Sequence, residues 1–293
     1  MGKNFRELLE ARWASGRFVC VGLDSEFSKI PVSAHQSGNE CEVSVANTIV
    51  AFNRAIVEAT HDFACAFKPN LAFYAAHGEE GLAALCRTIA DIRAIAPGVP
   101  VILDAKFGDI GNTNTGYVQE AFDFLHADAV TVHPYLGAEA LKPFLDRADK
   151  GIIVLCRTSN PGAGEFQDLL VPVAGTARRV PLYQHVAYRV AAEWNRNGNC
   201  ALVVGATYPR ELAAVRGIVD DMPILIPGIG AQGGDVEATV KAGMDSRGTG
   251  MIVNSSRGII FASNGKDFAD AAAREAEKLN NLINQYRRVE EAA

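Results

Sequence analysis

Residues 101–113 read VILDAKFGDIGNT, an apolar run that ends in three charged side chains. The first residues predict a buried β-strand. Side chains two positions apart in a strand point to the same face, so Asp104 and Lys106 project together from its end. Asp109 follows where the strand has given way to a loop. Two like charges about 4 Å apart repel by roughly 4 kcal/mol at an effective dielectric near 20, and such costs are met more often at functional sites.

Seven other apolar runs share this character, each with four to six strongly apolar residues bounded by Gly, Pro or polar residues. They span residues 17–24, 63–70, 127–134, 151–158, 200–207, 222–230 and 249–256. Segments with helical spacing lie between them, for example 45–60, 81–95 and 181–198. Strands that alternate with helices predict a parallel sheet covered by helices. Eight such units predict an α/β protein with a (β/α)8 TIM barrel, a parallel eight-stranded barrel with outer helices. An open doubly wound sheet is the alternative that periodicity does not exclude.

The length of 293 residues suits a single (β/α)8 barrel domain over residues 1–293, since such barrels hold about 250 residues plus insertions. We expect an N-terminal helix and two long connections, near 25–42 and 162–180. Both connections follow the carboxyl ends of strands, where barrel active sites form. Long loops there predict lids or binding loops, with passive insertion as the alternative. Residues 268–293 predict a closing amphipathic helix.

Composition excludes several classes of protein. A formal net charge of -6 argues against a general nucleic-acid binder. The first residues lack the apolar core of a secretory signal, and no apolar run is long enough to span a bilayer. We therefore expect a cytoplasmic protein with no membrane partner. The six cysteines form no C-x-x-C pair, which disfavours a zinc or redox site and favours buried thiols. His133, at a strand end, is interpreted as a structural hydrogen-bonding residue.

Polar residues close several of these strands, and in a barrel all such ends meet at one rim. Besides the residues of the third strand, they are Asp24, Lys68 and Ser159. The seventh strand runs into the glycine-rich PGIGAQGGD of residues 227–235, and Arg257 follows the eighth. A glycine-rich turn before a helix supplies backbone N–H groups for a phosphate, and an arginine adds a bidentate contact. Together they predict a ligand that is a phosphate monoester.

These residues resemble the orotidine 5'-phosphate decarboxylase family. Its signature, D-x-K-x-x-D followed by I-G-N-T, stands intact from Asp104 to Thr113. The resemblance also includes Lys68, the SNPGA stretch from Ser159 and the glycine-rich turn, so it spans most of the chain. The long loops make the chain similar to the longer bacterial members.

The resemblance implies a cofactor-independent and metal-independent decarboxylation of orotidine 5'-phosphate to uridine 5'-phosphate, in de novo pyrimidine biosynthesis. The catalytic residues that it implies are Lys68, Asp104, Lys106 and Asp109. Lys106 protonates C6, and Asp109 enters the site of the partner subunit in a homodimer. The substrate-binding residues that it implies are Asp24 and Thr113 for ribose, Ser159 for the pyrimidine edge, and Gln232 and Arg257 for phosphate.

Two alternatives remain at this level. A sugar-phosphate aldolase or decarboxylase on a related barrel can share D-x-K-x-x-D, but commonly binds magnesium or uses a lysine Schiff base. A non-catalytic nucleotide-binding barrel is the other alternative, although Asp104 and Lys106 are both retained.

Overall fold

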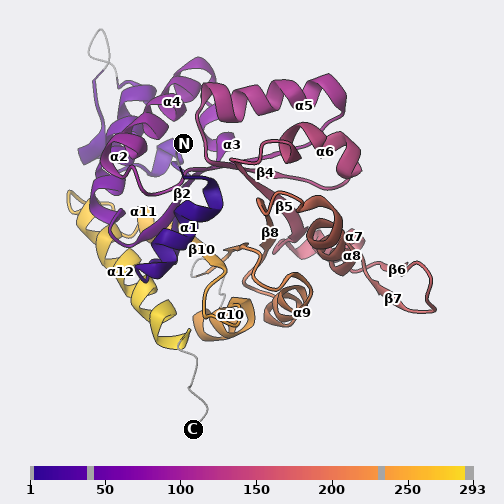
Figure 1. Ribbon diagram of the computed structural model, residues 1–293. Coiled ribbons are helices and arrows are strands. Elements are labelled where there is room, and N and C mark those ends of the chain that lie inside the picture. Colours follow the sequence, from indigo (N-terminus) through magenta and orange to yellow (C-terminus); the bar gives the residue numbers. More distant parts are fainter. Residues whose placement is uncertain (1–2, 38–42, 230–234, 288–293) are drawn as a thin grey trace.

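Eight parallel strands form the centre of the molecule, one for each predicted apolar run (Figure 1). The structure is a computed structural model and describes residues 3–37, 43–229 and 235–287. The strands are β1 (Val19–Leu23), β2 (Ala64–Pro69), β3 (Ile102–Phe107), β4 (Ala129–Val132), β5 (Gly151–Arg157), β8 (Cys200–Val204), β9 (Ile224–Pro227) and β10 (Met251–Ser255).

The sheet closes on itself. Its order is β2-β1-β10-β9-β8-β5-β4-β3, and the two ends of that order meet through the parallel bridges Phe67–Val101 and Asn70–Asp104. The predicted (β/α)8 barrel is therefore confirmed, and the open doubly wound sheet is excluded. Because all eight strands are parallel, their carboxyl ends share one rim.

Helices surround the barrel (Figure 1). The α-helices are α1 (Phe5–Ala14), α2 (Val45–Thr60), α3 (Leu71–Ala75), α4 (Gly78–Ile95), α5 (Gly111–Val118), α6 (Gly137–Leu145), α7 (Gly164–Gln167), α8 (Leu182–Arg189), α9 (Pro209–Val219), α10 (Val236–Gly243), α11 (Arg257–Ile260) and α12 (Phe268–Tyr286). Short 3-10 turns occupy Phe27–Lys29, Val32–Ala34 and Pro161–Ala163, and π-helical turns extend α5 over Gln119–Phe124 and α8 over Val190–Trp194. No helix among the described residues is long and apolar enough to cross a membrane.

Helix α2 illustrates why these segments fold as they do. The Ser44 hydroxyl caps its first turn by accepting a hydrogen bond from the N–H of Asn47, at 3.2 Å. Ile49, Phe52 and Ile56 recur at helical spacing and are all fully buried. One apolar stripe thus covers the outside of the barrel, while the opposite face of the helix meets water.

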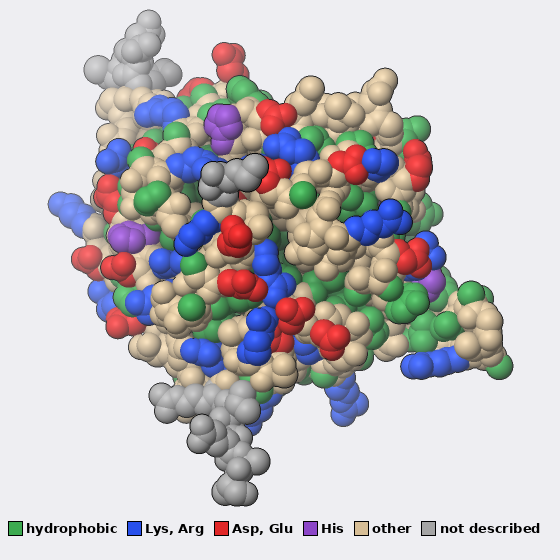
Figure 2. All heavy atoms as spheres, viewed as in Figure 1, with side chains coloured by type: hydrophobic (Ala, Val, Ile, Leu, Met, Phe, Trp, Pro, Cys, Tyr) green, Lys and Arg blue, Asp and Glu red, His purple; other side chains and the backbone are tan. Residues whose placement is uncertain are grey.

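The long connection after β5 contains structure that periodicity did not indicate. Strands β6 (Leu170–Pro172) and β7 (Arg179–Pro181) pair antiparallel in a hairpin that projects from the body (Figure 1). Hydrophobic side chains gather where the hairpin joins the body (Figure 2). Cys20, Cys65, Cys156 and Cys200 are buried free thiols, as expected, whereas Cys41 lies outside the described residues.

Candidate active site

Asp104 is the centre of a charged network at the carboxyl ends of β2 and β3. Its Oδ2 accepts a hydrogen bond from Lys68 Nζ at 2.8 Å, and its Oδ1 accepts one from Lys106 Nζ at 2.6 Å. Asp24 Oδ1, just beyond β1, lies 3.8 Å from Lys68 Nζ. The structure thus brings together Asp24, Lys68, Asp104 and Lys106 in an array of alternating sign, from three neighbouring strands.

This alternation controls the ionisation of the two buried members. Burial alone would raise the pKa of Asp104, but the ammonium groups of Lys68 and Lys106 outweigh it and hold that pKa well below its usual value. Burial would lower the pKa of Lys68, but Asp104 and then Asp24 outweigh it and raise that pKa. Both residues are therefore charged at neutral pH. The side chain of Lys106 is 49% exposed, so its ammonium contacts Asp104 at the solvent-accessible edge of the network.

A cavity of about 150 Å³ opens beside this network. It is lined by Asp24, Lys68, Asn70, Asp104, Pro227, Gly228, Ile229, Asn254, Ser255, Ser256 and Arg257. Arg257, the first residue of α11, thus shares one cavity with the carboxylates and Lys68, as its place after the eighth strand predicts. Gly228 begins the glycine-rich turn with φ at 103°, a backbone conformation that favours glycine.

Three other predicted residues lie elsewhere in this chain. The carboxylate of Asp109 accepts a hydrogen bond from the N–H of Ile110 at 2.7 Å, and no salt bridge between described residues joins it to Lys68 or Lys106. Thr113 is exposed on the first turn of α5. Ser159 follows β5 and packs against the end of β8, where a Cβ on Gly205 would lie 2.7 Å from the Ser159 Cβ. Gln232 lies outside the described residues.

Sequence reasoning missed two asparagines of the cavity. Asn254, on β10, is 6% exposed, and its Oδ1 has no hydrogen-bond partner among the described residues. Asn70 follows β2, next to Lys68 in the lining. The available signal was the polar Asn254 that interrupts the apolar run MIVNSS, since a buried amide is costly unless a partner binds it.

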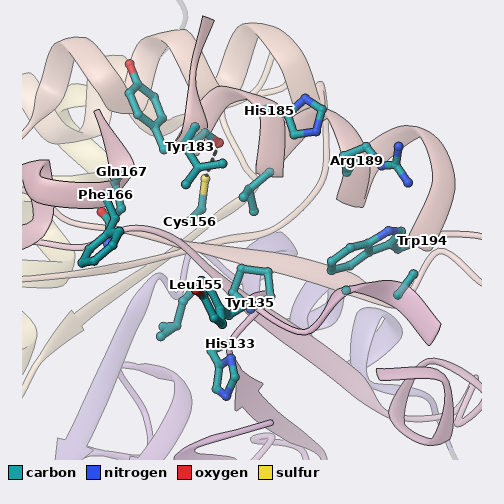
Figure 3. Close-up of a pocket in the computed structure, with 15 residues that line it drawn as sticks. His133, Tyr135, Leu155, Cys156, Phe166, Gln167, Tyr183, His185, Arg189 and Trp194 are labelled. Carbon is teal, nitrogen blue, oxygen red and sulfur yellow. Dashed lines mark hydrogen bonds between the residues drawn. The ribbon is translucent and has the colours of Figure 1, made fainter. Parts of the chain in front are cut away.

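A larger cavity of about 760 Å³ shares no lining residue with the first (Figure 3). It is lined mainly by apolar side chains of the β4–α6 connection, β5, α7 and α8, among them Tyr135, Phe166 and Trp194. His133 borders it and contacts the Gly108 carbonyl oxygen through Nε2 at 3.1 Å. This contact fits the structural interpretation of His133 and joins the apolar cavity to the loop that carries Asp109.

The fold and the site together define a class: a (β/α)8 barrel with a Lys–Asp–Lys array beside an arginine at the carboxyl rim. The model of the orotidine 5'-phosphate decarboxylase / HUMPS family matches residues 18–272, and the chain belongs to this family.

Proteins named orotidine 5'-phosphate decarboxylase are similar over nearly the whole chain. That of Janthinobacterium sp. (strain Marseille) is 50% identical over 284 residues, covering 96% of this chain and 98% of the relative. That of Ralstonia pickettii (strain 12J) is 51% identical and covers 97% and 99%.

Solved structures of the same family have a similar fold. The Leishmania donovani OMP decarboxylase superposes with a TM-score of 0.78 at 38% identity, covering 96% of this chain and 98% of that one. The Leishmania donovani UMP synthase gives a TM-score of 0.84 at 39% identity, and this chain spans 58% of its length.

Proposed function

We propose that this protein decarboxylates orotidine 5'-phosphate to uridine 5'-phosphate, in the de novo synthesis of pyrimidine nucleotides. The observation that carries the proposal is the ammonium of Lys106, which Asp104 holds at 2.6 Å beside a cavity lined by Arg257. The names and high identity of the relatives support the same activity. A cytoplasmic location stays a prediction.

The chemistry explains the array. Loss of CO2 leaves an electron pair at C6 of the pyrimidine, and the proposal requires no cofactor to accept it. The fixed ammonium of Lys106 stabilises that carbanion electrostatically and then donates a proton to C6. Asp104, charged at neutral pH, lies beside the position of the substrate carboxylate, and their repulsion is relieved as CO2 leaves. Lys68 keeps Asp104 ionised.

The remaining roles follow the cavity and the family resemblance. Arg257 and Gln232 bind the phosphate, and Asp24 binds a ribose hydroxyl. Ser159 reads the edge of the pyrimidine from the loop after β5. Binding energy from the phosphate, far from C6, holds the loops closed over the base.

We also propose that the active unit is a homodimer with shared sites, in which Asp109 and Thr113 serve the partner subunit. An apolar surface beside the Asp109 loop supports this proposal. Tyr135 is 87% exposed, Ile110 60% and Phe166 59%. Tyr135 and Phe166 also line the large cavity, and exposed apolar side chains of this kind are typical of a protein–protein interface. Burying that surface would bring Asp109 of one subunit toward the rim of the other.

The test is a spectrophotometric assay with purified protein. Orotidine 5'-phosphate should be consumed, with uridine 5'-phosphate and CO2 released in equal amounts, at the same rate with and without EDTA. Loss of activity in EDTA, or trapping of the substrate on a lysine by borohydride, would instead indicate the aldolase type of chemistry. Substrate binding without turnover would indicate a non-catalytic nucleotide-binding barrel.

A further inference from the structure

Strand β3 is irregular at the point where it carries its charges. Leu103 pairs with Val130 of β4, but the next pair is Phe107 with Val132. Three residues of β3 therefore lie opposite one residue of β4, which is Thr131. This bulge turns the backbone, and Lys106 has φ at 52°, in the left-handed region that residues other than glycine rarely adopt.

The hydroxyl of Thr131 makes two hydrogen bonds inside the bulge. Its Oγ1 accepts the backbone N–H of Lys106 at 2.9 Å and donates to Asp104 Oδ1 at 2.9 Å. Thr131 is 1% exposed, so water does not replace these bonds. A hydroxyl can donate and accept at the same time, and it therefore joins the two catalytic residues through one atom.

We propose that Thr131 is a positioning residue for the proton donor. It satisfies the N–H that the bulge removes from the β3–β4 ladder and so keeps Lys106 in its left-handed conformation. It also fixes the Asp104 oxygen that holds Lys106 Nζ at 2.6 Å. The two hydrogen bonds of Thr131 thus fix both the backbone of Lys106 and the carboxylate that holds its ammonium. This inference rests on the proposed decarboxylase activity, but Thr131 has no role assigned there.

The branched side chain suits this role. Two heavy substituents on Cβ restrict χ1, so threonine holds its hydroxyl in fewer orientations than serine does. Valine has nearly the same shape and lacks the hydroxyl. Thr131→Val therefore removes both hydrogen bonds with little change in packing, and Thr131→Ser restores them on a looser side chain.

The experiment compares kcat, KM and the melting temperature of wild type, Thr131→Val and Thr131→Ser, assayed well below the melting temperatures. We expect Thr131→Val to lose about 10- to 100-fold in kcat, because a small misplacement of a reacting group can cost about 100-fold. KM should change less than about threefold, since Thr131 does not line the cavity. Thr131→Ser should recover most of kcat.

Thr60→Val is the matched control. Thr60 is also fully buried, and its hydroxyl donates to the Ile56 carbonyl at 2.7 Å at the end of α2, away from the rim. This variant should lower stability at most and leave kcat unchanged. If Thr131→Val behaves in the same way, with kcat within twofold of wild type, Thr131 is structural only and the inference is wrong.

A crystal structure of Thr131→Val gives a readout that does not depend on activity. We expect Lys106 to leave the left-handed region, or its Nζ to move away from Asp104. An unchanged bulge and ion pair would contradict the inference even if wild type proved inactive, whereas inactive wild type alone would contradict only the proposed function. If Thr131→Val fails to fold, Thr131→Ala takes its place in both measurements.

Discussion

At the scale of single residues, Asp104 decides the electrostatics of the site. Its two carboxylate oxygens hold Lys68 and Lys106 on opposite sides, so each ammonium has a fixed direction. The two lysines differ in burial: Lys68 is 3% exposed, whereas the Lys106 side chain is about half exposed. Lys68 is therefore a fixed, buried charge between Asp104 and Asp24 in the cavity lining, while the more exposed Lys106 can reach a ligand above the rim.

Replacing Lys106 tests the proton donor directly. Lys106→Ala should fold normally because the side chain is half exposed. It should lose at least about 10³-fold in kcat, since a general acid contributes about 10² to 10⁴ and electrostatic stabilisation adds to it. Steady-state kinetics and circular dichroism provide the measurement. Lys142→Ala, which removes an exposed lysine paired with Asp146 on α6, is the control and should keep full activity. A folded Lys106→Ala variant with near wild-type kcat would show that Lys106 is not the proton donor.

The depressed pKa of Asp104 predicts a pH dependence of stability. A carboxyl whose pKa is lower in the folded state contributes stability above its unfolded pKa of about 3.9, and this stability is lost as pH falls toward the folded pKa. Asp104→Asn also leaves the buried Lys68 without its main counterion. Losing one partner of a buried pair costs about 3 kcal/mol of unfolding free energy at pH 7.

The free energy of unfolding should therefore differ less between wild type and Asp104→Asn as the pH falls. At pH 3 the difference should be smaller than at pH 7 by about 1 kcal/mol. Urea unfolding at pH 7, 5 and 3 measures it. Asp146→Asn, at an exposed pair, should differ from wild type by less than about 1 kcal/mol at every pH. A constant difference for Asp104→Asn between pH 7 and pH 3 would show that its charge does not stabilise the fold.

At the scale of elements, the loop after β5 is held by a buried arginine. Arg157 is 3% exposed, and its guanidinium lies 4.1 Å from the centre of the Tyr208 ring. It donates hydrogen bonds to the Thr158 carbonyl, to Gln167 Oε1 and to Asp168 Oδ2, at 3.0, 3.3 and 3.2 Å. These contacts tie both ends of the segment that carries Ser159 to the last residue of β5 and bring them beside Tyr208, which precedes α9.

Arg157→Met should loosen that segment while keeping an unbranched side chain of similar length. We expect kcat/KM for orotidine 5'-phosphate to fall about tenfold, or about 1.4 kcal/mol, which is about half of what the three lost hydrogen bonds contribute at about 1 kcal/mol each to holding the loop. Limited proteolysis within residues 158–170 should become faster. Arg54→Met, on the exposed surface of α2, controls for the loss of charge. Unchanged proteolysis together with unchanged kcat/KM would mean that the loop holds its position without Arg157.

The elements also show what the sequence could predict. All eight barrel strands were predicted, because a strand buried on both faces must be a short continuous apolar run. The hairpin β6–β7 was not, since LVP and RVP are too short and too exposed to show a pattern. The bulge at Lys106 was not predicted either, because a left-handed lysine depends on Thr131, which is 25 residues away in the chain. Local periodicity carries no information about such a contact.

At the scale of the whole molecule, the loop of Asp109, the predicted catalytic residue that does not join the others, lies beside an apolar surface. Lys68, Asp104, Lys106 and Arg257 meet at the rim, but Asp109 is turned toward its own backbone. The Asp109 loop touches His133, which borders the large apolar cavity (Figure 3). A second subunit that covered this face would exclude water from the apolar side chains and could receive Asp109 at the same time.

Exchange between two inactive variants tests this arrangement. Lys106→Ala and Asp109→Ala should each be inactive as pure homodimers. In a mixed dimer, one site combines both lesions, while the other combines an intact Lys106 from one chain with an intact Asp109 from its partner. Random exchange makes half of the dimers mixed, so about a quarter of all sites should recover activity under two-fold symmetry. Subunit exchange is verified separately with differently tagged chains.

The matched control mixes Lys106→Ala with Asp104→Ala. Asp104 and Lys106 belong to one site of one chain, because their side chains are joined at 2.6 Å. Every site of that mixed dimer therefore carries one lesion, and no activity should return. Recovery in the first mixture alone requires Asp109 to act across the interface. If Asp109 served its own chain, both mixtures would stay inactive after verified exchange, and the shared site would be wrong while the decarboxylase proposal still stood.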